Sequence, residues 1–81
     1  MNRDKFITSI NSAKAVKASI YTDCFSFTDI IIIKAVKDMY SEQIKLYGNC
    51  GILSVKMENC IEETVDYGTL YHFGELNLFV A

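Results

Sequence analysis

The side chains best suited to catalysis in this sequence are a single histidine, His72, and three cysteines, Cys24, Cys50 and Cys60. A catalytic histidine needs a nucleophile or an orienting carboxylate beside it. The sequence contains no G-x-S-x-G, H-E-x-x-H or S-x-x-K pattern and no glycine-rich phosphate loop. We therefore expect no catalytic residue and no enzyme, with His72 in a structural or rim position.

Metal and disulfide chemistry are disfavoured by spacing. Cys50, Cys60 and His72 are separated by 10 and 12 residues, whereas zinc sites usually contain at least one close ligand pair. An odd number of cysteines without a C-x-x-C pair predicts reduced thiols in place of a disulfide scaffold. The acidic residues 62–66 lack the twelve-residue calcium-loop pattern and read as a solvated turn. We expect no metal and no cofactor.

The C-terminal part carries the most suggestive pattern. Residues 57–81 hold five acidic side chains and no lysine or arginine. In the last apolar run Phe79 is out of phase with its neighbours, so we expect it to face away from the core and to share its face with Tyr71 and Phe73. Aromatic and acidic side chains on an edge strand are typical of a protein interface, although a second covered sheet face would give the same pattern. The predicted binding residues are Glu62, Glu63, Asp66, Tyr67, Tyr71, Phe73, Glu75 and Phe79.

This pattern predicts a non-catalytic protein that docks by its acidic, aromatic face on a basic protein surface. Seven of the eight basic residues are lysine, and isoleucine and asparagine are frequent; this bias is typical of low-GC bacteria and their phages. Small phage and mobile-element inhibitors of the anti-CRISPR or other antidefence type fit this description. One alternative is a homo-oligomeric structural or ligand-binding protein, such as a homodimer. A nucleic-acid binder using Arg3, Lys5, Lys14 and Lys17 is less favoured, because the rest of the chain is acidic.

Length and composition set the frame for these side chains. With 81 residues, 51 % of them apolar and 22 % charged, the chain is expected to form one globular domain over residues 1–81. The longest apolar run, residues 30–33, is far shorter than the roughly 20 residues that span a bilayer. No signal-peptide pattern is visible, so we expect a cytoplasmic protein without membrane contact.

Periodicity predicts one helix and then short strands. Phe6, Ile10 and Ala13 mark a helical face over residues 3–13, capped by Asn2 or Asp4. We favour its continuation to about residue 19, although Val16, Ala18 and Ile20 also alternate as in a strand.

Strands are predicted over residues 30–37, 42–47, 52–58, 69–73 and 76–80, with a turn and a short strand before them at 21–29 and a polar connection through Glu62 and Glu63. The four consecutive isoleucines indicate a central strand covered on both faces. Gly48-Asn49-Cys50-Gly51 is a strong hairpin signal, and Asp66-Tyr67-Gly68 and Gly74-Glu75 mark further bends.

The expected fold is therefore α+β, with the N-terminal helix packed on a meander of four to five antiparallel strands. Strongly bent strands would close it into a small barrel. The segments LSVKMENCIEE and GTLYHFGELNLFV, within residues 42–80, resemble the hydrophobic pattern of Sm-like small barrels. That resemblance implies RNA binding through two loops, but no basic residue follows Lys56, so the second, basic loop is missing.

Overall fold

The computed structural model describes residues 2–81, and its first element is the predicted helix, α1 (Arg3–Ser12). The Asn2 side chain caps it by accepting a hydrogen bond from the backbone N–H of Lys5 at 2.8 Å. The expected continuation to residue 19 is wrong. The chain is extended at Ala13 and enters strand β1 (Val16–Tyr21), in which Val16 and Ala18 are buried on one face. Pairing with two neighbouring strands decides this ambiguous segment.

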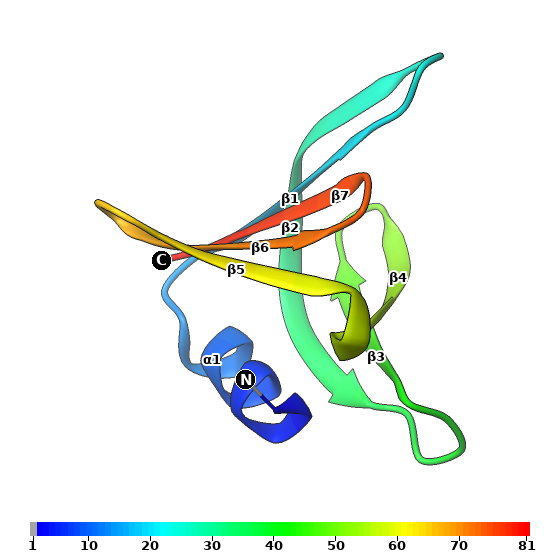
Figure 1. Cartoon of the computed structure of the whole chain (residues 1–81), viewed down its shortest axis with the longest axis vertical. Helices are drawn as coiled ribbons and strands as arrows, with labels where there is room; N and C mark the ends of the chain where they lie inside the picture. Colours follow the sequence, from blue (N-terminus) through cyan, green and yellow to red (C-terminus); the bar gives the residue numbers. More distant parts are fainter. Residues whose placement is uncertain (1) are drawn as a thin grey trace.

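Seven antiparallel strands follow the helix, more than the predicted four to five. After β1 come β2 (Ser26–Lys37), β3 (Gln43–Gly48), β4 (Gly51–Lys56), β5 (Cys60–Val65), β6 (Gly68–Phe73) and β7 (Leu76–Val80), with the 3₁₀ turn η1 (Met57–Asn59) before β5. They form one sheet in the order β4-β3-β2-β1-β7-β6-β5. The sheet curls into a half-barrel, and α1 lies on its concave side (Figure 1). The α+β class and the helix on one face are confirmed.

The expected polar connection through Glu62 and Glu63 is in fact the strand β5, which pairs with β6 along its whole length. Both glutamates are exposed. An edge strand has one open side, so it tolerates charged side chains that a central strand would exclude. β5 lies at one edge of the sheet and β4 at the other.

Pairing between the first and last strands joins two meanders, β1–β4 and β5–β7, into one sheet. Val16 lies opposite Val80 and Ile20 opposite Leu76. Beyond this ladder the backbone N–H groups of Lys14 and Ala15 donate to the Ala81 carbonyl, and the Ala81 N–H donates to the Ala15 carbonyl. Hydrogen bonds between residues 14–15 and Ala81 therefore extend the pairing of β1 with β7.

The core fills the concave side between α1 and the sheet. Phe6 of α1 is fully buried, and its ring meets those of Tyr71 and Phe73 edge-on at 5.0 and 5.6 Å between centroids. The remaining buried residues are Ile10, Val16, Ala18, Ile30, Ile32, Ala35, Ile44, Leu46, Val55, Leu78 and Val80. Buried residues alternate with exposed or half-buried ones in β1, β3 and β7, and in β2 up to its register shift, so one face of the sheet supplies the core.

The prediction that the isoleucine run is covered on both faces is wrong. Ile30 and Ile32 are buried, whereas Ile31 and Ile33 are exposed on the convex face. The only helix of the described chain lies on the concave side, so no element covers these two side chains.

Two asparagine side chains tie irregular parts of β2 to the body. The Ala35 N–H donates to Oδ1 of Asn11 at 2.8 Å, and Nδ2 of Asn11 donates to the Ala35 carbonyl at 3.0 Å. The Ile31 N–H donates to Oδ1 of Asn49, whose own N–H donates to the Ile31 carbonyl. Both contacts lie near the register shift between Ile32 and Lys34, where side-chain amides replace strand partners.

Candidate functional site: a groove at the open end of the half-barrel

The eight predicted binding residues do not form one surface. Tyr71 is 2 % exposed and packs against Phe6, so the prediction that it is an exposed aromatic is wrong. The reason is strand register: Tyr71 lies opposite Leu78, and Phe79 lies opposite Leu70. Tyr71 and Phe73 therefore belong to the concave face. Phe79 faces away from the core, as predicted, and is half-buried on the convex face.

The acidic members of the predicted set are also dispersed. Glu62 lies opposite Tyr71 and shares its face, whereas Glu63 lies opposite Leu70 on the convex face. Asp66 and Tyr67 form the β5–β6 turn, and Glu75 belongs to the β6–β7 turn at the other end of β6. Of the eight, Phe73 and Glu75 lie close together, and it is at this end that the sheet shows an open apolar surface.

A transverse row of apolar side chains crosses five strands at this end. Phe27 of β2 is opposite Ile20 of β1, which is opposite Leu76 of β7; Leu76 is opposite Phe73 of β6, which is opposite Cys60 of β5. Directly opposed residues share a face, so all five point to the concave side. We call this set the open row: Phe27 is exposed, and the other four are half-buried.

The neighbouring row is closed. Ile30, Ala18, Leu78 and Tyr71 oppose one another across β2, β1, β7 and β6, and all four are buried. We call this set the covered row. Phe6 of α1 packs on Tyr71 and reaches Phe73 from that side. The helix thus covers the concave face up to the open row and leaves the end beyond it without a cover.

The β1–β2 hairpin carries the apolar surface beyond the body of the protein. Pairing of β1 with β7 ends at Ile20, and pairing of β2 with β3 begins at Ile32. Apart from one hydrogen bond from the Tyr21 N–H to the β6–β7 turn, residues 21–27 project from the body (Figure 1). We call residues 21–27 the arm. Phe25 and Phe27 are 52 % and 56 % exposed, and their rings contact edge-on at 5.1 Å between centroids. Thr22 closes the tip, since its N–H and its hydroxyl both bond the Phe25 carbonyl.

The accessible surface of the protein is larger than that of a typical compact monomer. The chain exposes 5415 Å², whereas a compact folded monomer of 9.2 kDa is expected to expose about 4,900 Å². Single exposed apolar side chains are ordinary, but a contiguous apolar surface on a projecting element marks a contact site.

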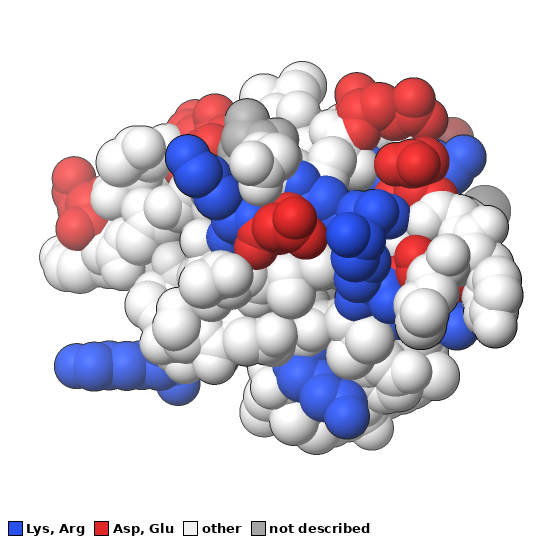
Figure 2. All heavy atoms as spheres, turned by 90° about the horizontal axis from the view of Figure 1, so that it is seen from below, with Lys and Arg blue, Asp and Glu red and all other residues white. Residues whose placement is uncertain are grey.

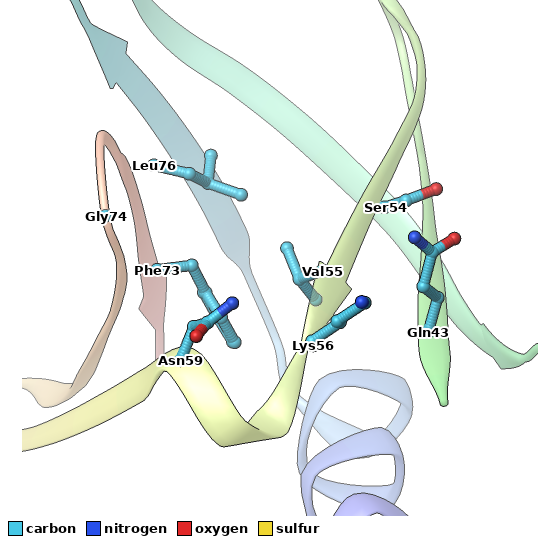
Figure 3. A pocket seen from close by; sticks show the side chains of 8 residues that line it. All are labelled: Gln43, Ser54, Val55, Lys56, Asn59, Phe73, Gly74 and Leu76. Carbon is cyan, nitrogen blue, oxygen red and sulfur yellow. The ribbon is translucent and has the colours of Figure 1, made fainter. Parts of the chain in front are cut away.

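A cleft of about 600 Å³ lies beside the open row, between β4 and the β6–β7 turn (Figure 3). Phe73, Gly74 and Leu76 form one wall, and Ser54, Val55 and Lys56 form the other. Val55 points across the cleft toward Leu76 and Phe73, while the amide side chains of Gln43 and Asn59 complete the lining. We call the cleft together with the open row the groove. Gly74, at φ +64°, has no heavy atom within 4 Å of where a side chain would begin, so this wall is open.

One side of the groove carries acidic side chains and no lysine or arginine. No lysine or arginine occurs in residues 18–33 or 57–81, which supply the arm and the β5–β7 wall. Asp23 lies at the arm tip. Glu75 lies in the β6–β7 turn beside the base of the arm, where its carbonyl accepts a hydrogen bond from the Tyr21 N–H at 3.1 Å. Lys56 is the one basic residue of the cleft lining.

Basic side chains gather elsewhere. Seen from below, the face around α1 carries a band of lysine and arginine with acidic groups among them (Figure 2). Lys37 pairs there with Asp4 at 3.6 Å. The four bases considered for nucleic acid are spread out: Arg3 and Lys5 lie on α1, Lys14 lies before β1, and Lys17 lies within β1.

The described residues show a small polar cluster around the one histidine, on the convex face. Nδ1 of His72 contacts the amide oxygen of Asn77, and Nε2 lies 3.5 Å from Glu63. These contacts orient the ring, but no nucleophilic side chain contacts it. Within residues 2–81, no group of three histidine, cysteine or carboxylate side chains is arranged to hold a metal ion.

Cys60 ends the open row and is the most enclosed of the three thiols; Cys24 and Cys50 are exposed in hairpin turns. Burial raises the pKa of the Cys60 thiol, and the Glu62 charge adds to the effect. Burial and then Glu62 likewise raise the pKa of Tyr71. Both groups are therefore protonated and neutral near pH 7, as suits an apolar face.

No protein-family model, curated protein or solved structure matches this chain. None of the helices in the described part of the chain is long and apolar enough to cross a membrane. Sequence reasoning did not assign the arm to a site, although two signals were present: the Phe-Ser-Phe alternation of residues 25–27 and the absence of any base from residues 18–33.

Proposed function

We propose that the protein is a non-catalytic binding module that takes an apolar segment of a basic protein partner into the groove and against the arm. The open row carries this proposal. It extends the apolar concave face beyond the covered row, and it leads to the exposed Phe25 and Phe27 of the arm. A partner that covers this end would remove contiguous apolar surface from water, which is the main driving force for association.

Charge favours a basic partner over the alternatives. The arm and the β5–β7 wall contain aspartate and glutamate but no lysine or arginine, so they attract basic side chains and repel phosphate backbones. A homodimer through this surface would bring two acidic walls together, at a cost in repulsion. Inhibition of an enzyme that acts on nucleic acid is a specific form of this proposal, because such enzymes present basic grooves.

The test begins with peptides selected for binding from a display library of random linear sequences. We expect the enriched peptides to combine apolar residues with lysine or arginine. Replacing Phe25 and Phe27 together by serine should weaken their binding at least tenfold, measured by fluorescence anisotropy. The matched control replaces Met39 and Tyr40 by serine, since these side chains are 88 % and 97 % exposed on a different loop.

The electrostatic part has its own control. The pair Asp23→Asn and Glu75→Gln should weaken binding at low salt and flatten its dependence on ionic strength. Asp66→Asn, at the opposite end of β6 from Glu75, should change neither. Enrichment of acidic peptides, or equal binding by the arm variant and the Met39/Tyr40 control, would contradict the proposal.

A further inference from the structure

The half-barrel has an open seam. Its two edge strands, β4 and β5, pair on one side only, so each presents a row of backbone N–H and C=O groups without a strand partner. Beside β4 this edge borders the groove. Ser54, Val55 and Lys56, three consecutive residues of β4, all line the cleft. Alternate side chains of a strand point to opposite faces, so a cleft lined by three in succession runs along the strand's backbone edge.

We propose that the partner segment binds in extended form, as an additional strand on the outer edge of β4, and that it fills the seam of the half-barrel. This inference rests on the proposed function and names the conformation and pattern of the ligand. Main-chain hydrogen bonds to β4 would supply affinity, and side-chain pockets would supply sequence preference, as in other cases of strand addition.

The geometry favours β4 over the other edge. Val55 projects from β4 toward Leu76 and Phe73 across the cleft and is itself buried. Inward side chains of a strand laid on β4 would therefore meet the half-buried Leu76 and Phe73 of the facing wall. β5 contributes no residue to the cleft lining. A strand added to the β5 edge would therefore lie outside the cleft, without an apolar floor.

The pairing also defines the segment's pattern. β4 has six residues, which span roughly 20 Å at strand rise, so the segment needs five or six extended residues. Every second side chain should be apolar, because it faces Leu76 and Phe73. Basic residues belong at the end that reaches the arm, where Asp23 and Glu75 lie.

Hydrogen exchange with a selected peptide tests the pairing directly. At a peptide concentration of 100 times Kd, the outward-facing amides of β4 should exchange up to about 100-fold more slowly. The amides of β5, the second edge strand, should not change and serve as the control within the same molecule.

N-methylation of the peptide gives a second readout. Methyl groups on alternate backbone nitrogens should lower affinity about tenfold each, and those on the intervening nitrogens should have little effect. If the peptide binds and loses affinity with the arm variant, but protects no β4 amide and shows no period of two, the inference is wrong and the proposed function stands. If no peptide is selected at all, the proposed function itself is wrong and this inference falls with it.

Discussion

The covered row and the open row are adjacent on the same concave face. Both cross β2, β1, β7 and β6, and the open row continues to Cys60 of β5. The four members of the covered row are buried, whereas in the open row Phe27 is exposed and the other four members are half-buried. Side-chain chemistry does not separate them, since both rows are apolar and both contain aromatic side chains. What separates them is the position of α1. Phe6 of this helix packs on Tyr71 of the covered row and meets the open row at Phe73, whereas Phe27 at the other end of the open row is 56 % exposed.

This difference bears on how a core is told from a contact surface. Apolar alternation along a strand predicts which face is shielded from water. It does not predict whether the element that shields this face comes from the same chain or from a partner. Here the same face is core under Phe6 and is partly open beyond it, where we propose that a partner binds. We expect stability to depend on the covered row and affinity for a partner to depend on the open row.

Two leucines in β7 offer the sharpest test of this division. Leu78, in the covered row, is fully buried, and Leu76, in the open row, is half-buried. Leu78→Ala should lower the free energy of unfolding by about 3–5 kcal/mol, because it leaves a cavity that the core cannot close. Leu76→Ala should cost about 1–2 kcal/mol, in proportion to its smaller buried area.

Urea denaturation measures both losses, and the pair is matched in residue type, strand and face. Leu76→Ala should in addition weaken binding of a selected peptide, since Leu76 lines the cleft. Equal losses of stability from the two substitutions would break the distinction between the rows.

Much of the fold was predictable because its signals are local. The isoleucine run, the alternation around Ile44 and Leu46, and the Gly-Asn-Cys-Gly turn all identify strands and a hairpin without reference to the rest of the chain. β7 matches its predicted range, residues 76–80.

The predictions that were wrong share one physical cause, which is strand pairing between distant parts of the chain. Val16 and Ile20 fit both a helical and a strand period, and their pairing with Val80 and Leu76, far along the chain, decides for the strand. The face of Tyr71 depends on the β6–β7 register, which a local pattern does not fix. The arm projects because β3 and β7 stop short of it, and nothing within residues 21–27 encodes that.

A second test concerns how firmly α1 is held as the cover. Asn11 bonds both backbone groups of Ala35, so Asn11→Ala leaves a part-buried donor and acceptor without partners. We expect a loss of about 1–3 kcal/mol in the free energy of unfolding, measured by urea denaturation. Ser12→Ala is the control, because the Ser12 hydroxyl bonds only within the helix, to Thr8, and should change stability by about 0.5 kcal/mol or less.

The smallest expected effect lies at the β5 end of the open row, at Cys60. The folded protein holds the thiol proton more tightly than the unfolded chain does, because burial and Glu62 raise its pKa above 9.0. This contribution to stability is fully present below the unfolded pKa and is lost as pH rises through the folded pKa.

Near pH 8, iodoacetamide should therefore alkylate Cys60 more slowly than the exposed Cys24 and Cys50, as followed by mass spectrometry of the three peptides. A partner segment seated in the groove should slow Cys60 further and leave Cys50 unchanged, since Cys60 ends the open row and Cys50 lies in the β3–β4 turn. Alkylation of all three thiols at one rate would contradict this prediction. It would show that solvent reaches the open row at its β5 end as freely as it reaches the hairpin turns.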